Sequence, residues 1–154
     1  MSRNDLFIEG AEIFFRNFAG LEGNFNPAGK RTFCVYIDPD TAQKLKDDGW
    51  NVKVRQPKKE GDDPRPYIQV EVKYSNYPPK VYLITTNKTL LKEDQVALLD
   101  QAELLNVDLV INPSHYNFNG REGIKAYLKA GYFTIAEDKF EQKYNDFPES
   151  DQGF

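Results

Sequence analysis

Short runs of alternating apolar and polar residues, broken repeatedly by glycine and proline, are the feature of this 154-residue chain that most restricts its fold. Residues 67–74 show the pattern most clearly, with an apolar side chain at every second position. A period of two places these side chains on one face of a β-strand and indicates a half-buried sheet. We expect a small antiparallel barrel or sandwich, with further strands at residues 7–18, 31–37, 50–55, 80–86, 107–112 and 124–135.

Two segments have the pattern of short helices. Asp38 is a typical N-cap, Pro39 suits the first helical position, and Gly49 is a typical stop signal. Residues 93–105 begin with acidic side chains and carry an apolar face. Turn-forming residues predict loops at 19–30, 58–66 and 113–123.

The composition excludes several classes of protein. One cysteine excludes a disulfide framework or a cysteine-rich zinc site, and one histidine leaves little for histidine-based catalysis. No run approaches the roughly 18 apolar residues of a membrane-spanning helix, and residues 1–10 lack the plan of a signal peptide. We therefore expect one soluble intracellular domain that needs no metal or cofactor.

The net charge of −4 is concentrated at one end of the chain. Residues 137–154 hold six of the 24 acidic residues but two of the 20 basic ones, so residues 1–136 are neutral overall. This division predicts a folded domain at 1–136 and an acidic, flexible tail at 137–154. The tail is either an ordinary solvated end, a peptide that docks a partner through Phe154, or an anion that competes with nucleic acid for a basic groove.

Aromatic and basic side chains share strand faces. Spacing of two places Lys125, Tyr127 and Lys129 together. Single-stranded nucleic acid is bound by such a combination, because cations follow the phosphates and flat rings stack on unpaired bases. The alternative is that aromatic residues simply favour strands and fill the core.

The first strand allows both interpretations. In a regular strand Phe14 would share a face with Arg16 and Phe18, and this face would bind nucleic acid. If that face is exposed, Phe15 could be the residue that points into the core. The loops at 19–30 and 113–123 present further aromatic and basic side chains without an obvious strand partner.

Four spaced blocks resemble a family of bacteriophage single-stranded DNA-binding proteins. They are RNFAGLEGNFNPAGKRTFCVYID (16–38), DGWNVK (48–53), PPKVYLIT (78–85) and NGREGIKAYLKAGYFTI (119–135). The resemblance implies an OB-fold, a five-stranded Greek-key barrel, which here would be an antiparallel barrel with two short helices and extra strands. It also implies binding of single strands during phage DNA replication and recombination, without catalysis, in the cytoplasm of the bacterial host.

The acidic end is similar to the tip of bacterial single-stranded DNA-binding proteins, which recruits replication partners. It departs from that tip because Gly153 precedes Phe154 and no dense run of aspartates comes before it. The resemblance implies replication or recombination proteins as partners of this tail.

We therefore predict a non-catalytic protein that coats single-stranded DNA through a basic and aromatic groove. The first alternative is a virion or assembly protein whose aromatic surface is a protein interface. The second is a magnesium-dependent nuclease that uses pairs of acidic residues. These pairs are Asp38/Asp40, Asp47/Asp48 and Asp62/Asp63, and helix capping and solubility explain them better. The predicted DNA-binding residues are Arg16, Phe18, Phe25, Lys30, Arg31, Lys53, Arg55, Tyr116, Phe118, Arg121, Lys125, Tyr127 and Lys129.

Overall fold

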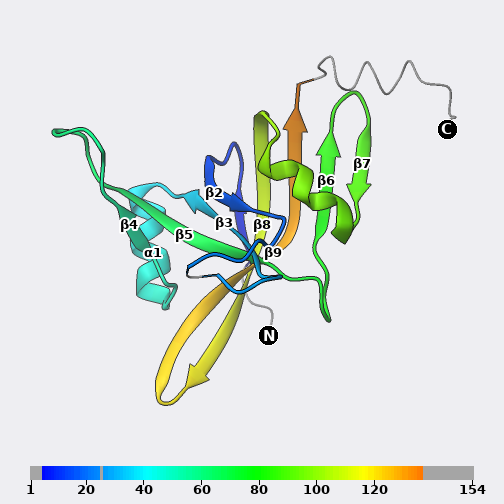
Figure 1. Ribbon diagram of the computed structural model, residues 1–154. Helices are drawn as coiled ribbons and strands as arrows, with labels where there is room; N and C mark the ends of the chain where they lie inside the picture. Colours follow the sequence, from blue (N-terminus) through cyan, green and yellow to red (C-terminus); the bar gives the residue numbers. More distant parts are fainter. Residues whose placement is uncertain (1–4, 25, 137–154) are drawn as a thin grey trace, which may run out of the picture.

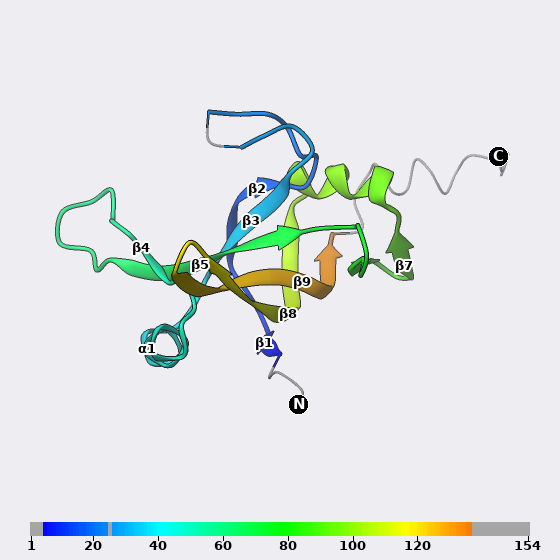
Figure 2. The same cartoon turned by 90° about the horizontal axis from the view of Figure 1, so that it is seen from below.

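A single β-sheet organises the structure, a computed structural model that describes residues 5–24 and 26–136. Its main path runs through β1 (Leu6–Ile8), β8 (Leu104–Phe118), β9 (Arg121–Ile135), β5 (Arg65–Val72), β3 (Arg31–Tyr36) and β2 (Ile13–Asn17). Off this path lie β4 (Lys53–Arg55) on β5, β6 (Lys80–Ile84) on β9 and β7 (Lys88–Leu91) on β6. Figures 1 and 2 show the strongly twisted sheet from two directions.

The prediction of a mainly β fold with two helices is confirmed, with two differences in detail. Two of the strand pairs, β5 with β9 and β6 with β9, are parallel. The long chain segments between these strands permit this, since parallel neighbours need a crossover connection and not a tight turn. The path of paired strands also stays open between β1 and β2 among the described residues.

The β8–β9 hairpin replaces the loop predicted at 113–123. Both strands continue to the register pair Phe118 and Arg121, and Asn119 and Gly120 form the two-residue turn with φ of 53° and 78°. Positive φ at both central residues is typical of a type I′ turn, which suits the twist of a hairpin. The outer part of this hairpin projects from the body (Figure 1), so it needs few apolar residues and its sequence resembles a loop.

The first helix, α1 (Pro39–Asp48), forms as predicted. The Asp38 side chain accepts a hydrogen bond from the Thr41 backbone N–H at 2.9 Å, and Gly49 ends the helix at φ 103°. The second helix is shorter than predicted, because the 3₁₀ helix η1 (Glu93–Asp100) gives way to β8 at Leu104. Strand β7 lies in a segment for which the sequence predicted no element.

The core is built from buried side chains of β3, β5, β6, β8, β9, α1 and η1 and includes Phe18. This ring is fully buried, stacked on Phe33 at 5.3 Å between ring centroids and edge-on to Phe133 at 5.6 Å. The prediction that Phe18 stacks on a base is therefore wrong, because no face of the ring reaches the surface.

Arg16 connects β2 to η1. Its Nη1 donates to the carbonyl oxygens of Leu99 at 2.7 Å and Ala102 at 2.8 Å, where the helix leaves carbonyls unpaired. Asp100 in return accepts from the backbone N–H groups of Phe18 and Ala19. Arg16 thus holds the fold together, and the register shift between Phe14 and Asn17 removes it from the face of Phe14 on which it was predicted.

Candidate nucleic-acid interface

A groove opens where two strands share one edge of β5. Strand β4 pairs with residues 65–67 of β5 and β9 pairs with Val70 and Glu71, while β3 occupies the opposite edge. The β8–β9 hairpin diverges from β5 between these two contacts. The resulting hollow, called the groove below, has a volume of about 470 Å³ and is lined by Lys30, Thr32, Trp50, Asn51, Ile68, Gln69, Glu71, Ser114, Tyr116, Phe118, Ile124, Lys125, Ala126 and Tyr127.

Five of the residues predicted to bind DNA come together in this groove. Lys30 approaches from the start of β3, Tyr116 and Phe118 from β8, and Lys125 and Tyr127 from β9. Phe118 is 71% exposed, so its ring is accessible from solvent. The groove thus combines accessible rings with cations.

Tyr116 lies flat against its cross-strand partner, Gly123. A Cβ atom at position 123 would lie 2.5 Å from the Tyr116 hydroxyl oxygen and 2.7 Å from Cζ. Only glycine therefore leaves room for the ring in this orientation. The ring lies over Gly123 of β9 and also lines the groove.

Charged side chains surround Tyr127. Lys125 Nζ lies 2.8 Å from Glu71 Oε1, and this close ion pair raises the pKa of Lys125 above its ordinary value, so the ammonium is charged at neutral pH. The ammonium nitrogens of Lys125 and Lys73 lie 5.6 and 5.9 Å from the centroid of the Tyr127 ring. A base stacked on this ring would have cations close to its phosphates.

A second hollow continues from the groove and shares Lys30, Glu71 and Lys125 with it. It adds Arg31, whose Nη1 lies 3.0 Å from Glu93 Oε2. The predicted residue Arg31 therefore joins the same basic surface.

The remaining predicted cations lie elsewhere. Arg121 is exposed at the tip of the β8–β9 hairpin, and Lys129 Nζ is bound to Asp5 Oδ2 at 2.8 Å. Lys53 and Arg55 belong to β4, toward the other end of β5. The predictions for Phe25 and Phe154 fall outside the described residues.

Sequence analysis missed the polar face of β5. Tyr67, Gln69, Glu71 and Lys73 alternate with the apolar residues, and the structure places Gln69 and Glu71 in the groove. The alternation at 67–74 held this signal, since the side chains opposite the core must face outward. The aromatic residues around Arg55 were likewise not predicted as one group.

The chain belongs to a family of phage single-stranded DNA-binding domains. The family model described as "Putative phage ssDNA-binding domain" matches residues 1–154, which is the whole chain. A search of curated protein sequences gives no match. Among the described residues, no helix is long and apolar enough to cross a membrane.

Solved structures of the single-stranded DNA-binding protein from bacteriophage Enc34 have a similar fold. The structure of that protein in complex with ssDNA is 14% identical, with a TM-score of 0.58, over 88% of this chain and 89% of the other. Its C-terminal truncation is 13% identical, with a TM-score of 0.56, over 87% of each chain. The predicted fold class is confirmed by this likeness, and the mixed open sheet is consistent with an OB-like fold.

Proposed function

We propose that this protein binds single-stranded DNA along the groove, largely without sequence preference and without a catalytic step. The observation that carries the proposal is the convergence of Tyr116, Phe118 and Tyr127 with Lys30 and Lys125 in one open hollow. Stacking on aromatic rings is worth about 1–3 kcal/mol per base and tolerates any sequence. Membership of the phage ssDNA-binding domain family supports the same function.

The proposed roles follow from the positions of the side chains. Phe118 and Tyr127 offer ring faces to bases, while Lys30, Lys73 and Lys125 bind the phosphates that connect them. Phosphate oxygens would replace the Glu71 carboxylate at Lys125. Because a lysine that neutralises a phosphate releases cations condensed on the DNA, affinity should fall as salt rises.

The proposal extends to the setting in which the protein acts. We infer that it coats exposed strands during phage DNA replication and recombination, in the cytoplasm of the bacterial host. The family and its structural neighbours are ssDNA-binding proteins, which supports a role without catalysis. The proposed domain organisation has a second part, the acidic tail at residues 137–154. This tail, with Phe154 at its end, would recruit partner proteins or compete with DNA. Residues 137–154 lie outside the described residues.

Titration with an oligo-dT of about 30 nucleotides tests the proposal. Trp50 lines the groove, so its fluorescence should change and saturate as the strand binds. Measurement at several salt concentrations should give a linear fall of log affinity with log salt. The variant Phe118→Ala should bind more weakly, and Phe7→Ala, which removes an equally exposed ring from β1, should not. Absence of binding at low salt would overturn the proposed function.

A further inference from the structure

Strand β2 contains a bulge that changes the direction of a phenylalanine. Phe14 pairs with Cys34 and Asn17 with Thr32, so three residue steps along β2 lie opposite two along β3. The extra residue coincides with Phe15, which has a left-handed backbone with φ 50°. In a regular strand Phe14 and Phe15 would face opposite sides of the sheet. The bulge instead brings both rings to Arg55, whose guanidinium carbon lies 4.5 and 4.7 Å from their centroids.

The conformation of Phe15 is not explained by the core. A left-handed backbone is strained for a residue with a bulky side chain. The Phe15 side chain is 62% exposed, so burial of the ring does little to offset that strain. Strained residues concentrate at functional sites, and an exposed ring in this state indicates a surface that receives a ligand.

The rings beside Phe15 are already held in place. Phe14 stacks on Tyr36 with 4.3 Å between centroids and 25° between planes, and meets Tyr67 edge-on at 5.1 Å. Phe15 lies edge-on to Phe14 at 4.8 Å. We call these four aromatic residues, with Arg55 and Arg65, the arginine–aromatic cluster.

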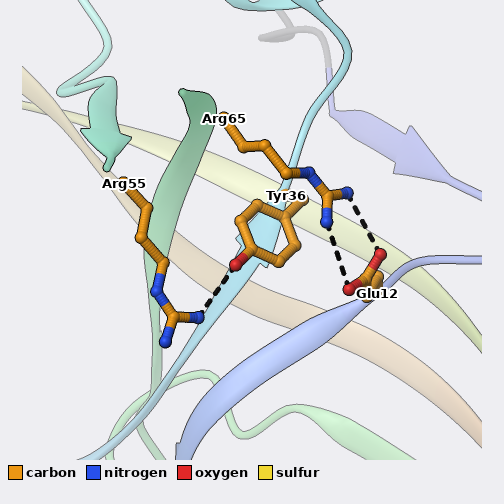
Figure 3. A network of polar contacts seen from close by, with 4 residues as sticks. All are labelled: Glu12, Tyr36, Arg55 and Arg65. Carbon is orange, nitrogen blue, oxygen red and sulfur yellow. Dashed lines mark hydrogen bonds and ion pairs between the residues drawn. The ribbon is translucent and has the colours of Figure 1, made fainter. Parts of the chain in front are cut away.

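Two arginines fix Tyr36 from different sides, as Figure 3 shows. Arg55 donates to the Tyr36 hydroxyl oxygen at 2.8 Å. The Arg65 guanidinium lies 3.7 Å from the centre of the Tyr36 ring and donates to both carboxylate oxygens of Glu12. The cluster thus carries two guanidinium groups against one carboxylate, which favours an anionic ligand.

The cluster and the groove share the outer face of β5. Tyr67 belongs to the cluster, while Gln69 and Glu71, which point to the same side of the strand, line the groove. The four residue steps from Tyr67 to Glu71 span about 13 Å of extended strand. One DNA strand that leaves the groove along this face would reach the cluster next.

We propose that the arginine–aromatic cluster is a second base-stacking site for the same single-stranded DNA, with Phe15 as the stacking surface and Arg55 as the phosphate contact. The proposal rests on the proposed function, because it extends the path of the strand that occupies the groove. Flat rings beside the Arg55 guanidinium, which forms no ion pair among the described residues, fit the chemistry of a nucleotide, which has an aromatic base and an anionic phosphate.

The variant Phe15→Ala tests the site through its affinity for dT oligomers of increasing length. For about 30 nucleotides we expect a loss of roughly 5- to 100-fold, the equivalent of one lost stacked base. The loss should shrink for oligomers too short to leave the groove. Phe15→Tyr keeps the ring and should bind like the wild type, and Phe7→Ala is the control for removing an exposed phenylalanine. Melting curves check that each variant folds.

Photo-crosslinking provides a direct test on the unaltered protein. Oligo-dT substituted with 5-iodouracil should crosslink to the peptide that contains Phe15, as well as to the hairpin peptide that contains Tyr116 and Phe118. This inference alone would be overturned if the wild type binds DNA, Phe15→Ala binds with normal affinity and no crosslink forms in the cluster. Failure of the wild type to bind would instead overturn the proposed function.

Discussion

The groove and the arginine–aromatic cluster hold their cations in different ways. In the groove, Lys125 is paired with the carboxylate of Glu71 at 2.8 Å. In the cluster, Arg55 lies against aromatic rings and binds the hydroxyl of Tyr36. A phosphate entering the groove must displace a carboxylate, whereas one entering the cluster meets a guanidinium already fixed by rings. Lys125 of the groove should therefore contribute mainly through a salt-sensitive phosphate contact, and Phe15 of the cluster mainly through uncharged stacking.

The largest effect on affinity is expected for Lys125→Ala. This change removes a phosphate contact and leaves Glu71, whose side chain is largely buried, without its cation. We expect affinity for a dT oligomer of about 30 nucleotides to fall roughly 10- to 100-fold. The slope of log affinity against log salt should become shallower by about 0.7, the value for one phosphate contact on a single strand. Phe15→Ala in the cluster should leave that slope almost unchanged.

A second substitution separates the two effects at Lys125. Glu71→Gln alone should tighten binding, because no carboxylate then competes with phosphate. Added to Lys125→Ala, it should recover part of the lost affinity. The contrast between groove and cluster would be refuted if Lys125→Ala left the slope of log affinity against log salt unchanged. It would also be refuted if Phe15→Ala changed that slope as much as Lys125→Ala does.

A smaller effect is expected for Gly123→Ala. The new methyl group would occupy the space of the Tyr116 ring and push it out of place. We expect affinity to fall roughly 5- to 10-fold, toward the lower end of the value of one stacked base, with little change in melting temperature. Gly23→Ala is the matched control, since a Cβ atom there meets nothing within 4 Å. If Tyr116 carries the effect, Gly123→Ala should cause no further loss in a Tyr116→Ala background.

The smallest effect is expected for the chemical reactivity of Cys34. This residue lies on β3 between the two regions and pairs with Gln69. Burial raises the pKa of this thiol to about 11, although Lys53 and Arg55 oppose the shift. A raised pKa keeps the thiol protonated at pH 8, so alkylation by iodoacetamide should be much slower than in denatured protein. Intact mass measured over time follows the reaction. Equally fast alkylation of the folded protein would mean that this part of the sheet opens readily, which would contradict a preformed cluster.

Local patterns predicted the elements that depend on local chemistry. The caps around α1 act within a few residues, and the alternation at 67–74 corresponds to β5 because one face of that strand is buried. The same local logic failed for the β8–β9 hairpin, whose outer half packs on little and therefore shows no apolar pattern. It also failed at Phe15, because a bulge depends on the register with β3 and not on neighbours along the chain.

Patterns along the chain were enough to predict a mainly β fold, the position of α1 and the combination of lysine with tyrosine around position 127. These features arise from side chains close together in the chain, where strand period and capping decide the outcome. Only the tertiary structure decided which aromatic residues remain accessible. Phe18 and Phe15 are three residues apart, yet one is buried in the core and the other exposed beside Arg55. Burial depends on the bulge in β2 and on partners that are distant in the chain, such as Phe133, which no local pattern contains.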